Sequence, residues 1–356
     1  MHVLSTLHRP PEMDARPFKD WPSSFAIALA RLDEWYQEGK PFFTKNDLED
    51  LSNQLNRRYP TRRTNAQRRL IAVKGLTGSV VLYSDLTGQI IPNQGPNEEW
   101  AVKSPYVRYV CYEKLKEVLR KPNANIVEAF YPMQIDHLML RRAINTKKPL
   151  TPKWAECPEP VEQYLKQHLE SWKKTTEYHK LEKILKLFKH DITKVINLGS
   201  GWMEFGMGLE EFSRCATQHA LTIVLYQLLQ KKTNNTIKHY AQDPAYTAVD
   251  ILALSLHGCE VLEDPQALIE IDDDSVVFAC CPGFPLKDIT TDIARPAMLI
   301  WDQVHERFGA RSQNPNSPRV REMIAAHYDC HRFWDQDPQH PAPFKSDLVV
   351  YIRRRK

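Results

Sequence analysis

The chain has 356 residues, of which 42% are hydrophobic and 26% charged, and its formal net charge at pH 7 is +4. No segment holds the roughly eighteen apolar residues that a membrane-spanning helix needs, and the N-terminus lacks the apolar core of a secretory signal. The seven cysteines are scattered without a C-x-x-C pair, which argues against a disulfide framework or a zinc site. We therefore expect a cytoplasmic protein with one large or two moderate domains and no bound metal.

Residues 1–150 are expected to form a basic, mostly helical region with a short β-hairpin. Apolar spacing predicts a helix over 23–37, and Thr44 is typical of the residue that precedes a second helix. Short strands separated by glycines are predicted at 70–74, 79–84 and 89–92, and further helices at 107–119 and 133–144. Four prolines between Pro149 and Pro160 mark the boundary of this region.

Residues 151–356 show alternating helix and strand patterns. Strands are predicted at 194–198, 237–241, 259–262, 275–281 and 347–352, and helices at 161–189, 210–229, 248–257 and 291–307. Alternation of this kind is typical of a parallel sheet covered by helices, so we expect an α/β, Rossmann-like domain with helices on both faces. In such sheets ligands bind at the carboxyl ends of the strands.

The strand predicted at 194–198 runs directly into a glycine turn, Gly199-Ser200-Gly201. Glycines after a strand let the backbone approach a ligand, and the next helix N-terminus favours a negative group. The turn is neither G-x-G-x-x-G nor a nucleophile elbow. It is similar to a methyltransferase glycine loop, but a ribose-binding acid is expected about twenty residues on, and Asp243 lies about twice that far. The alternative is a tight strand–helix turn without a ligand.

A second candidate region follows the strand predicted at 237–241. Asp243, with Gln242 before it and Tyr246 after it, could bind a cation or an amino group beside Ser200; Asp243 could equally be a helix N-cap. Other polar residues expected near the turn have structural alternatives, as core side chains or as acids that serve the helix dipole. They are Gln218, His219, Glu204, Glu210 and Glu211.

Two basic segments predict an anionic partner. Residues 51–84 contain no Asp or Glu, and their arginines would repel one another unless phosphate were nearby; they include Arg57, Arg58, Arg62, Arg63, Arg68 and Arg69. A lysine-rich helical segment begins at Lys173 and Lys174. Its alternative is a solvated amphipathic helix.

Seven ordered motifs within residues 190–305 resemble the fungal form of the "sensitivity to red light reduced" domain. They are Ile196-Asn-Leu-Gly-Ser-Gly201, Ala216-Thr-Gln-His-Ala220, Tyr240-Ala-Gln-Asp-Pro-Ala-Tyr246, His257-Gly-Cys-Glu-Val-Leu262, Ile271-Asp-Asp-Asp-Ser-Val-Val277, Cys281-Pro-Gly-Phe-Pro285, and Asp292-Ile-Ala-Arg-Pro296 with Trp301-Asp302. The chain is also similar to one branch of that family, the arginine-containing cyclodipeptide synthases of fungal secondary metabolism.

The resemblance to that branch implies an aminoacyltransferase that joins two aminoacyl groups, from arginyl-tRNA and a second charged tRNA, into a diketopiperazine. It implies no cofactor, no metal and no DNA or membrane partner. Ser200 would then accept the first aminoacyl group, Glu204 or Asp243 would hold or deprotonate the α-amino group, and Tyr246 would line the pocket. The guanidinium would pair with a carboxylate among Glu210, Glu211 and Asp288, and the basic segments would bind tRNA.

Two other functions are compatible with the same residues. One is a non-catalytic regulator of the light and circadian signalling family, which binds a nucleotide or a protein partner. The other is an S-adenosylmethionine-dependent methyltransferase. An Asp-x-x-Glu motif associated with the synthases is absent from the sequence.

Overall fold

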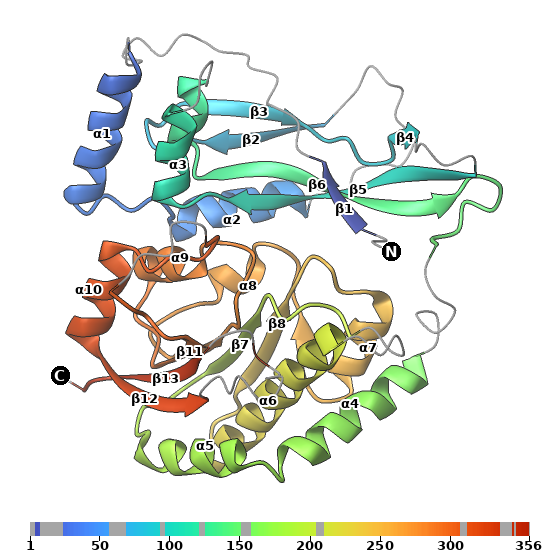
Figure 1. Cartoon of the computed structure of the whole chain (residues 1–356), viewed down its shortest axis with the longest axis vertical. Helices are drawn as coiled ribbons and strands as arrows, with labels where there is room; N and C mark the ends of the chain where they lie inside the picture. The colour runs from blue at the N-terminus through green and yellow to red at the C-terminus, as the bar shows by residue number, and fades with distance from the viewer. Residues whose placement is uncertain are drawn as a thin grey trace. The chain divides into compact units, whose positions relative to one another are not determined.

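A computed structural model describes residues 4–7, 24–56, 69–92, 97–120, 125–150, 158–203, 210–306, 312–334, 344 and 347–355 (Figure 1). The chain divides into two compact units, Met1–Thr151 and Pro152–Lys356. None of the helices in the described ranges is both long and apolar enough to cross a membrane. Within the same ranges no group of three or more His, Cys, Asp or Glu side chains is placed to hold a metal ion.

The first unit combines helices with two antiparallel sheets. Its four-stranded sheet has the order β1-β6-β5-β4, and a separate hairpin pairs β2 with β3. The elements are β1 (Leu4–Leu7), α1 (Phe25–Gln37), α2 (Lys45–Leu55), β2 (Leu70–Lys74), β3 (Val80–Ser84), β4 (Ile90–Pro92), β5 (Glu98–Tyr109), α3 (Tyr112–Leu119), the 3-10 helix η1 (Ile126–Phe130) and β6 (Met133–Ala143). Side chains of Ser24 and Thr44 cap α1 and α2, which confirms Thr44 as the start signal.

Two helix predictions in this unit are wrong. The prediction over 107–119 covers the end of β5 and then α3, and the prediction over 133–144 covers β6. The two strands pair with each other along most of their length, from Glu98 opposite Ala143 to Tyr109 opposite Met133. Leucine, methionine and arginine in β6 favour a helix locally, but pairing with β1 and β5 outweighs that weak preference.

The second unit alternates helices and strands, which confirms the predicted α/β class. Its elements are α4 (Pro158–Trp172), α5 (Thr176–Leu187), β7 (Lys194–Leu198), α6 (Glu210–Lys232), β8 (Lys238–Gln242), α7 (Ala248–Ser255), β9 (Glu260–Val261), α8 (Gln266–Ile269), β10 (Ser275–Phe278), α9 (Leu286–Ile293), β11 (Met298–Asp302), α10 (Pro318–His327), β12 (Tyr328–Trp334) and β13 (Leu348–Arg353).

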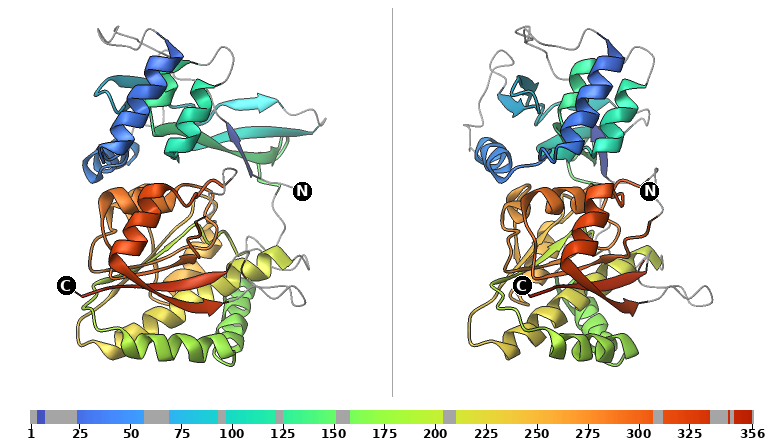
Figure 2. Two further views of the ribbon diagram at one scale, coloured as in Figure 1. Left: turned by 60° about the vertical axis from the view of Figure 1, so that its left-hand side comes forward. Right: turned by 90° about the vertical axis from the view of Figure 1, so that its left-hand side faces the viewer.

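These strands form one seven-stranded sheet in the order β12-β13-β11-β10-β7-β8-β9. Neighbours from β11 to β9 pair in parallel, whereas β13 is antiparallel to both β11 and β12. Figures 1 and 2 show α4, α5 and α6 on one face and α8, α9 and α10 on the other. The chain winds from β7 outward through β8 and β9, then returns to β10 and β11 on the other side. The strand order therefore reverses at β7, where such folds bind ligands.

Two helix predictions in this unit need correction. The single helix predicted over 161–189 is two helices, because Thr175 accepts a hydrogen bond from the backbone N–H of Tyr178 and caps α5. The helix predicted over 291–307 is wrong: α9 ends at Ile293, and the apolar run that follows is β11, buried between β10 and β13. A fully buried strand has no alternation that would distinguish it from a helix.

Candidate functional site

The glycine turn leaves the carboxyl end of β7. Gly199 and Gly201 have positive φ angles of 70° and 75°, a backbone conformation that side chains with a Cβ adopt at a cost. A Cβ on Gly201 would lie 2.8 Å from the sulfur of Cys215, and one on Gly199 would lie 3.1 Å from the Cβ of Pro282. Both glycines are therefore required by conformation and by close packing, and Ser200 between them is fixed in position.

A closed ring of hydrogen bonds holds this turn. Ser200 donates to Oδ1 of Asn197 (2.5 Å), whose amide nitrogen donates to Nδ1 of His219 (3.2 Å), and Nε2 of His219 donates to the carbonyl of Gly201 (3.0 Å). Asn197, Ser200 and His219 are all at most 2% exposed. Burial lowers the pKa of His219, which fits the neutral tautomer that this ring requires. His219 thus has a structural role in the turn.

An acceptor of an aminoacyl group has to be accessible to its substrate, whereas Ser200 is buried. Its side chain is 2% exposed, and its hydroxyl donates to an amide oxygen, which is not a base. A nucleophilic serine needs an adjacent base that takes its proton. The described hydrogen-bond partner of Ser200, the amide oxygen of Asn197, cannot act as that base.

Asp243 closes the turn from the neighbouring strand. Its Oδ2 accepts the backbone N–H of Gly201 (2.8 Å), and its Oδ1 accepts that of Ala245 (2.9 Å). Burial raises the pKa of Asp243, although both backbone hydrogen bonds oppose that shift. The sequence prediction placed Asp243 beside Ser200, and the structure joins it to the next residue of the turn.

A second carboxylate, Asp250, holds the chain just beyond the turn and was not singled out from the sequence. Its Oδ1 accepts the N–H of Met203 (2.7 Å), and its Oδ2 accepts the N–H (2.8 Å) and the hydroxyl (2.6 Å) of Thr247. Asp250 is 1% exposed and completes a capping box with Thr247. The signal was present in the sequence, because Thr-x-x-Asp before an apolar run is a capping-box pattern.

Two predicted substrate-binding residues carry polar atoms with no partner in the described part of the chain. These are the hydroxyl of Tyr246 and Oε1 of Gln218, both buried at the level of the atom. The Tyr246 ring lies with its centroid 5.6 Å from that of His219. Gln242 differs, because its side chain bonds to Asp264 and to the backbone of Ala267. Its side chain is therefore structural.

The loop after β10 forms the other side of the strand-order reversal. An added Cβ on Gly199 would contact Pro282 and Phe284, so this loop packs against the glycine turn. Cys281 in the same loop is exposed and has a φ of 49°. Positive φ is uncommon for a residue other than glycine and is often retained at functional sites.

Among the remaining predicted acids, Asp288 has a side chain that the structure describes. The carboxylate of Asp288 in α9 accepts the hydroxyl of Ser317 (2.5 Å) and is 8% exposed. Glu204 lies outside the described residues. Glu210 and Glu211 begin α6, but their side chains also lie outside the description.

The predicted tRNA-binding residues fall into three groups. Arg69 differs from the expectation, because it forms an ion pair with Asp85 (3.6 Å) and its side chain is only 10% exposed. Lys173 and Lys174 are exposed between α4 and α5, and Lys173 pairs with Glu170 (3.0 Å). The other arginines lie outside the described residues: Arg57, Arg58, Arg62, Arg63 and Arg68.

The imidazole ring of His239 in β8 is buried. It is 3% exposed, stacks on Tyr226 at a centroid distance of 4.9 Å, and neither ring nitrogen has a partner among the described residues. Burial, and then the nearby His219 and His257, lower its pKa to about 3. The unfolded chain therefore binds a proton here more readily than the folded chain, and stability is lost as the pH falls below about 6.5.

We expect His239→Leu to raise the free energy of unfolding by about 1–2 kcal/mol at pH 7, because two unsatisfied polar atoms are removed. The gain should be larger at pH 5, where the proton linkage adds to it. Urea unfolding at both pH values measures this. The exposed His305→Leu serves as control, and an equal gain for His239→Leu at the two pH values would contradict the linkage.

Comparison with solved structures shows distant similarity. One is the complex between the Haloferax volcanii Trm112 methyltransferase activator and a methyltransferase, with 12% identity, a TM-score of 0.28, and 55% of this chain and 98% of that chain covered. Two others are Haemonchus contortus phosphoethanolamine N-methyltransferase 2 with S-adenosyl-L-methionine (9% identity, TM-score 0.27) and with phosphomonomethylethanolamine and S-adenosylhomocysteine (10%, 0.26). In both, 68% of this chain and 57% of that chain are covered.

No curated protein matches the chain. Residues 163–340, half of the chain, match the SRR1 domain. This range contains the glycine turn, Asp243 and the loop after β10. The chain therefore belongs to the SRR1 (sensitivity to red light reduced) domain family.

Proposed function

We propose that the SRR1 domain of this chain binds a small molecule that contains a ribonucleoside, at the carboxyl ends of β7 and β8. The observation that carries the proposal is the 2.8 Å hydrogen bond between the N–H of Gly201 and Oδ2 of Asp243. It joins a glycine turn to a carboxylate at the end of the next strand. In dinucleotide-binding sheets the glycine turn approaches phosphate, and the carboxylate at the end of the next strand binds a ribose hydroxyl.

The long separation between the turn and Asp243 in the sequence is consistent with this placement. The intervening helix α6 has 23 residues, so it lengthens the chain without moving the strand that follows. β8 pairs in parallel with β7, with Leu198 opposite Gln242. Asp243 therefore follows the strand next to β7, which is where a ribose-binding acid is expected, even though it lies about twice the usual distance along the chain.

Asp243 also retains the capacity to bind hydroxyl groups. An ionised carboxylate has about four acceptor sites, and the backbone N–H groups of Gly201 and Ala245 occupy two of them. Vicinal ribose hydroxyls are suitable donors for the others. The unpartnered hydroxyl of Tyr246 and Oε1 of Gln218 supply further polar groups in the same unit.

The arrangement supports binding more strongly than aminoacyl transfer. The proposed acceptor Ser200 is buried and donates to Asn197, so its hydroxyl is not arranged as an activated nucleophile for a covalent aminoacyl intermediate. Each of the three functions compatible with the sequence involves a ligand that contains a ribonucleoside. These ligands are a free nucleotide, S-adenosylmethionine, and a charged tRNA with its 3′ adenosine. The experiment therefore compares them directly.

Isothermal titration of the full chain with ATP, S-adenosylmethionine and arginyl-tRNA tests the proposal. We expect at least one to bind saturably, and Asp243→Asn to weaken it about tenfold or more, since a hydrogen bond to an ionised group is worth about 1.5–3 kcal/mol. The 2′-deoxy analogue of the bound ligand should show a similar loss.

Asp274→Asn is the matched control for this titration, because Asp274 is exposed and its side chain has no partner among the described residues. Unchanged affinity in a folded Asp243→Asn variant would exclude the role of the carboxylate. Binding of arginyl-tRNA alone, without either small ligand, would favour the tRNA-dependent function.

A further inference from the structure

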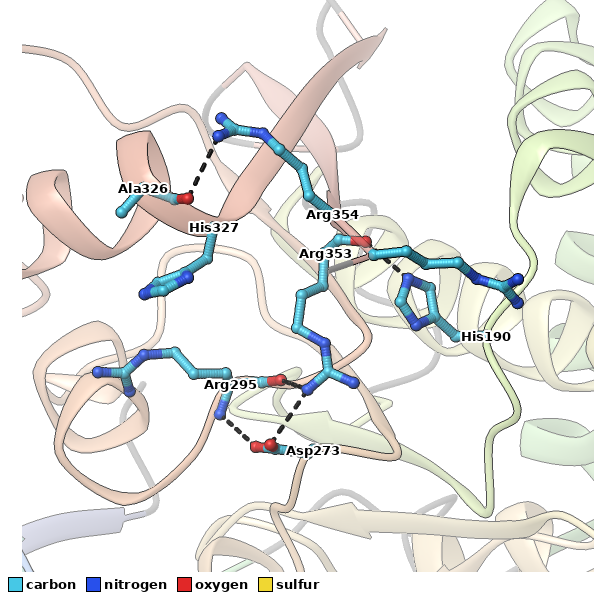
Figure 3. Close-up of a pocket in the computed structure, with 8 residues that line it drawn as sticks. His190, Asp273, Arg295, Ala326, His327, Arg353 and Arg354 are labelled. Atoms are coloured by element: carbon cyan, nitrogen blue, oxygen red, sulfur yellow. Dashed lines mark hydrogen bonds and ion pairs between the residues drawn. The ribbon is translucent and has the colours of Figure 1, made fainter.

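A basic pocket of the second unit lies at the ends of the sheet strands that are opposite to the glycine turn. Its volume is about 770 Å³, and four arginines and two histidines line it against one carboxylate (Figure 3). Arg295 precedes β11, Asp273 precedes β10, and Arg353 ends the antiparallel strand β13. All three mark the amino ends of the parallel strands. The pocket is therefore separate from the candidate ribonucleoside site.

Internal contacts fix two of its arginines. Arg353 forms an ion pair with Asp273 (3.2 Å) through Nη1, which also donates to the carbonyl of Arg295. The backbone N–H of Arg295 donates to the same carboxylate (2.8 Å), and Nε2 of His190 donates to the carbonyl of Arg353 (2.6 Å). In Figure 3 the side chain of Arg353 extends toward Asp273 and the backbone of Arg295. Asp273 is thus already engaged by Arg353 and by the backbone.

The ordinary explanation for arginines at this place is helix capping. Nη1 of Arg295 donates to the carbonyls of Thr291 (2.6 Å) and Ala294 (2.8 Å) at the end of α9. Basic side chains near a helix C-terminus satisfy its last carbonyls and oppose its dipole. For Arg295, however, capping uses only one of the three guanidinium nitrogens.

Arg354 also caps a helix and forms an ion pair. It pairs with Asp329 (3.0 Å) and donates to the carbonyls of Ala325 (2.9 Å) and Tyr328 (2.8 Å), close to the end of α10. Figure 3 shows its side chain turned toward Ala326. We therefore exclude Arg354 from the cations that are available to a ligand.

Three guanidinium groups of the pocket keep N–H donors that are available to a ligand. Nε and Nη2 of Arg295 and Arg353 have no partner among the described residues, and neither does the exposed side chain of Arg355. The imidazole of His327 in the pocket wall also has no hydrogen bond or ion pair in the described ranges, although its carbonyl accepts the backbone N–H of Arg354 (2.8 Å). Three guanidiniums against the single carboxylate of Asp273 leave an excess of two positive charges before either histidine is counted.

We propose that this pocket binds a terminal phosphate group of a small phosphorylated molecule. A phosphate monoester carries a charge of about −1.5 to −2 at pH 7 and three strong acceptor oxygens, which matches the unpaired charge of the pocket. Guanidinium groups recognise phosphate through paired N–H donors, and those of Arg295 and Arg353 are held in place by protein carbonyls. An RNA backbone offers the same chemistry as a diester, so the test includes it as the other source.

The test is titration of the full chain with pyrophosphate at low and high salt, followed by competition against a fluorescent single-stranded RNA. We expect saturable pyrophosphate binding that Arg355→Glu weakens about tenfold, because charge reversal acts at short range on a charged ligand. Arg355 is exposed and has no hydrogen bond or ion pair among the described residues, so this change should preserve the fold. Arg332→Glu, an exposed arginine of β12 outside the pocket, is the matched control.

The outcomes separate the two phosphate sources. Pyrophosphate binding that is sensitive to Arg355→Glu and insensitive to Arg332→Glu supports the pocket. RNA that binds there without competition from pyrophosphate would overturn the terminal-phosphate assignment. Failure of pyrophosphate to bind to folded protein at low salt, or equal loss in both variants, would overturn the site itself. Because the pocket lies at the opposite strand ends, none of these results depends on the ribonucleoside proposal.

Discussion

Replacing Asp250 by alanine is expected to lower the free energy of unfolding by about 3–5 kcal/mol, since each buried donor left without a partner costs about 1–3 kcal/mol and the costs are not fully additive. Three donors lose their acceptor: the backbone N–H of Met203 and the N–H and hydroxyl of Thr247. The side chain is 1% exposed, so water cannot easily replace the carboxylate. Urea unfolding followed by circular dichroism measures the loss.

Two variants make this prediction specific. Asp274→Ala removes an exposed carboxylate of the same unit and should change stability by no more than about 0.5 kcal/mol. Asp250→Asn keeps one acceptor oxygen and should lie between the wild type and Asp250→Ala. An Asp250→Ala variant as stable as the wild type would show that the carboxylate does not hold the loop, and would weaken the assignment of the adjacent turn as a fixed binding element.

Asp288 is expected to make the protein less stable at pH 8 than at pH 5. Burial raises the pKa of Asp288 to about 7, against the opposing hydrogen bond from Ser317. Between the unfolded pKa near 4 and the folded value, the folded chain holds a proton that the unfolded chain has lost. Stability therefore falls as the pH rises through this window, by up to about 4 kcal/mol, because each unit of pKa difference is worth about 1.4 kcal/mol.

Substitution isolates this contribution from the other titrating groups. Asp288→Asn retains an oxygen that can accept from Ser317 but carries no charge, so the wild-type minus variant difference should change by about 3 kcal/mol between pH 5 and pH 8. Asp274→Asn, in contrast, should give a difference that is nearly independent of pH. A pH-independent difference for Asp288→Asn would mean that the carboxyl group is not protonated in the folded protein near pH 6. His239 acts in the opposite direction and reduces stability at acidic pH.

The sequence was sufficient where local signals and the final structure agree. The caps at Thr44 and the turn at Gly199–Gly201 depend on side-chain and backbone chemistry within a few residues, and both are found as predicted. β6 and β11 were missed because their strand conformation comes from partners distant in the chain. The residues of β6 favour a helix locally, and the apolar run of β11 satisfies a helix and a buried strand equally well.

The site was predicted as a region more accurately than as a set of roles. The strand ends placed Asp243 beside the turn, as the structure has it. No sequence pattern indicated that Ser200 would point inward to Asn197, because that orientation is set by His219 on the packed helix α6. An asparagine within an otherwise apolar strand was the available sign, since a polar side chain in a buried strand needs partners.

The last strand along the chain, β13, lies inside the sheet between β11 and β12 and not at its edge. A ribosome delivers the chain from its N-terminus, so β11 and β12 are synthesised before the strand that pairs with both of them. Until Leu348–Arg353 emerges, the backbone N–H and C=O groups along one side of β11 form an open edge that can pair with other chains. We therefore expect a nascent chain of this protein to expose this edge late in translation, well after its glycine turn has been synthesised.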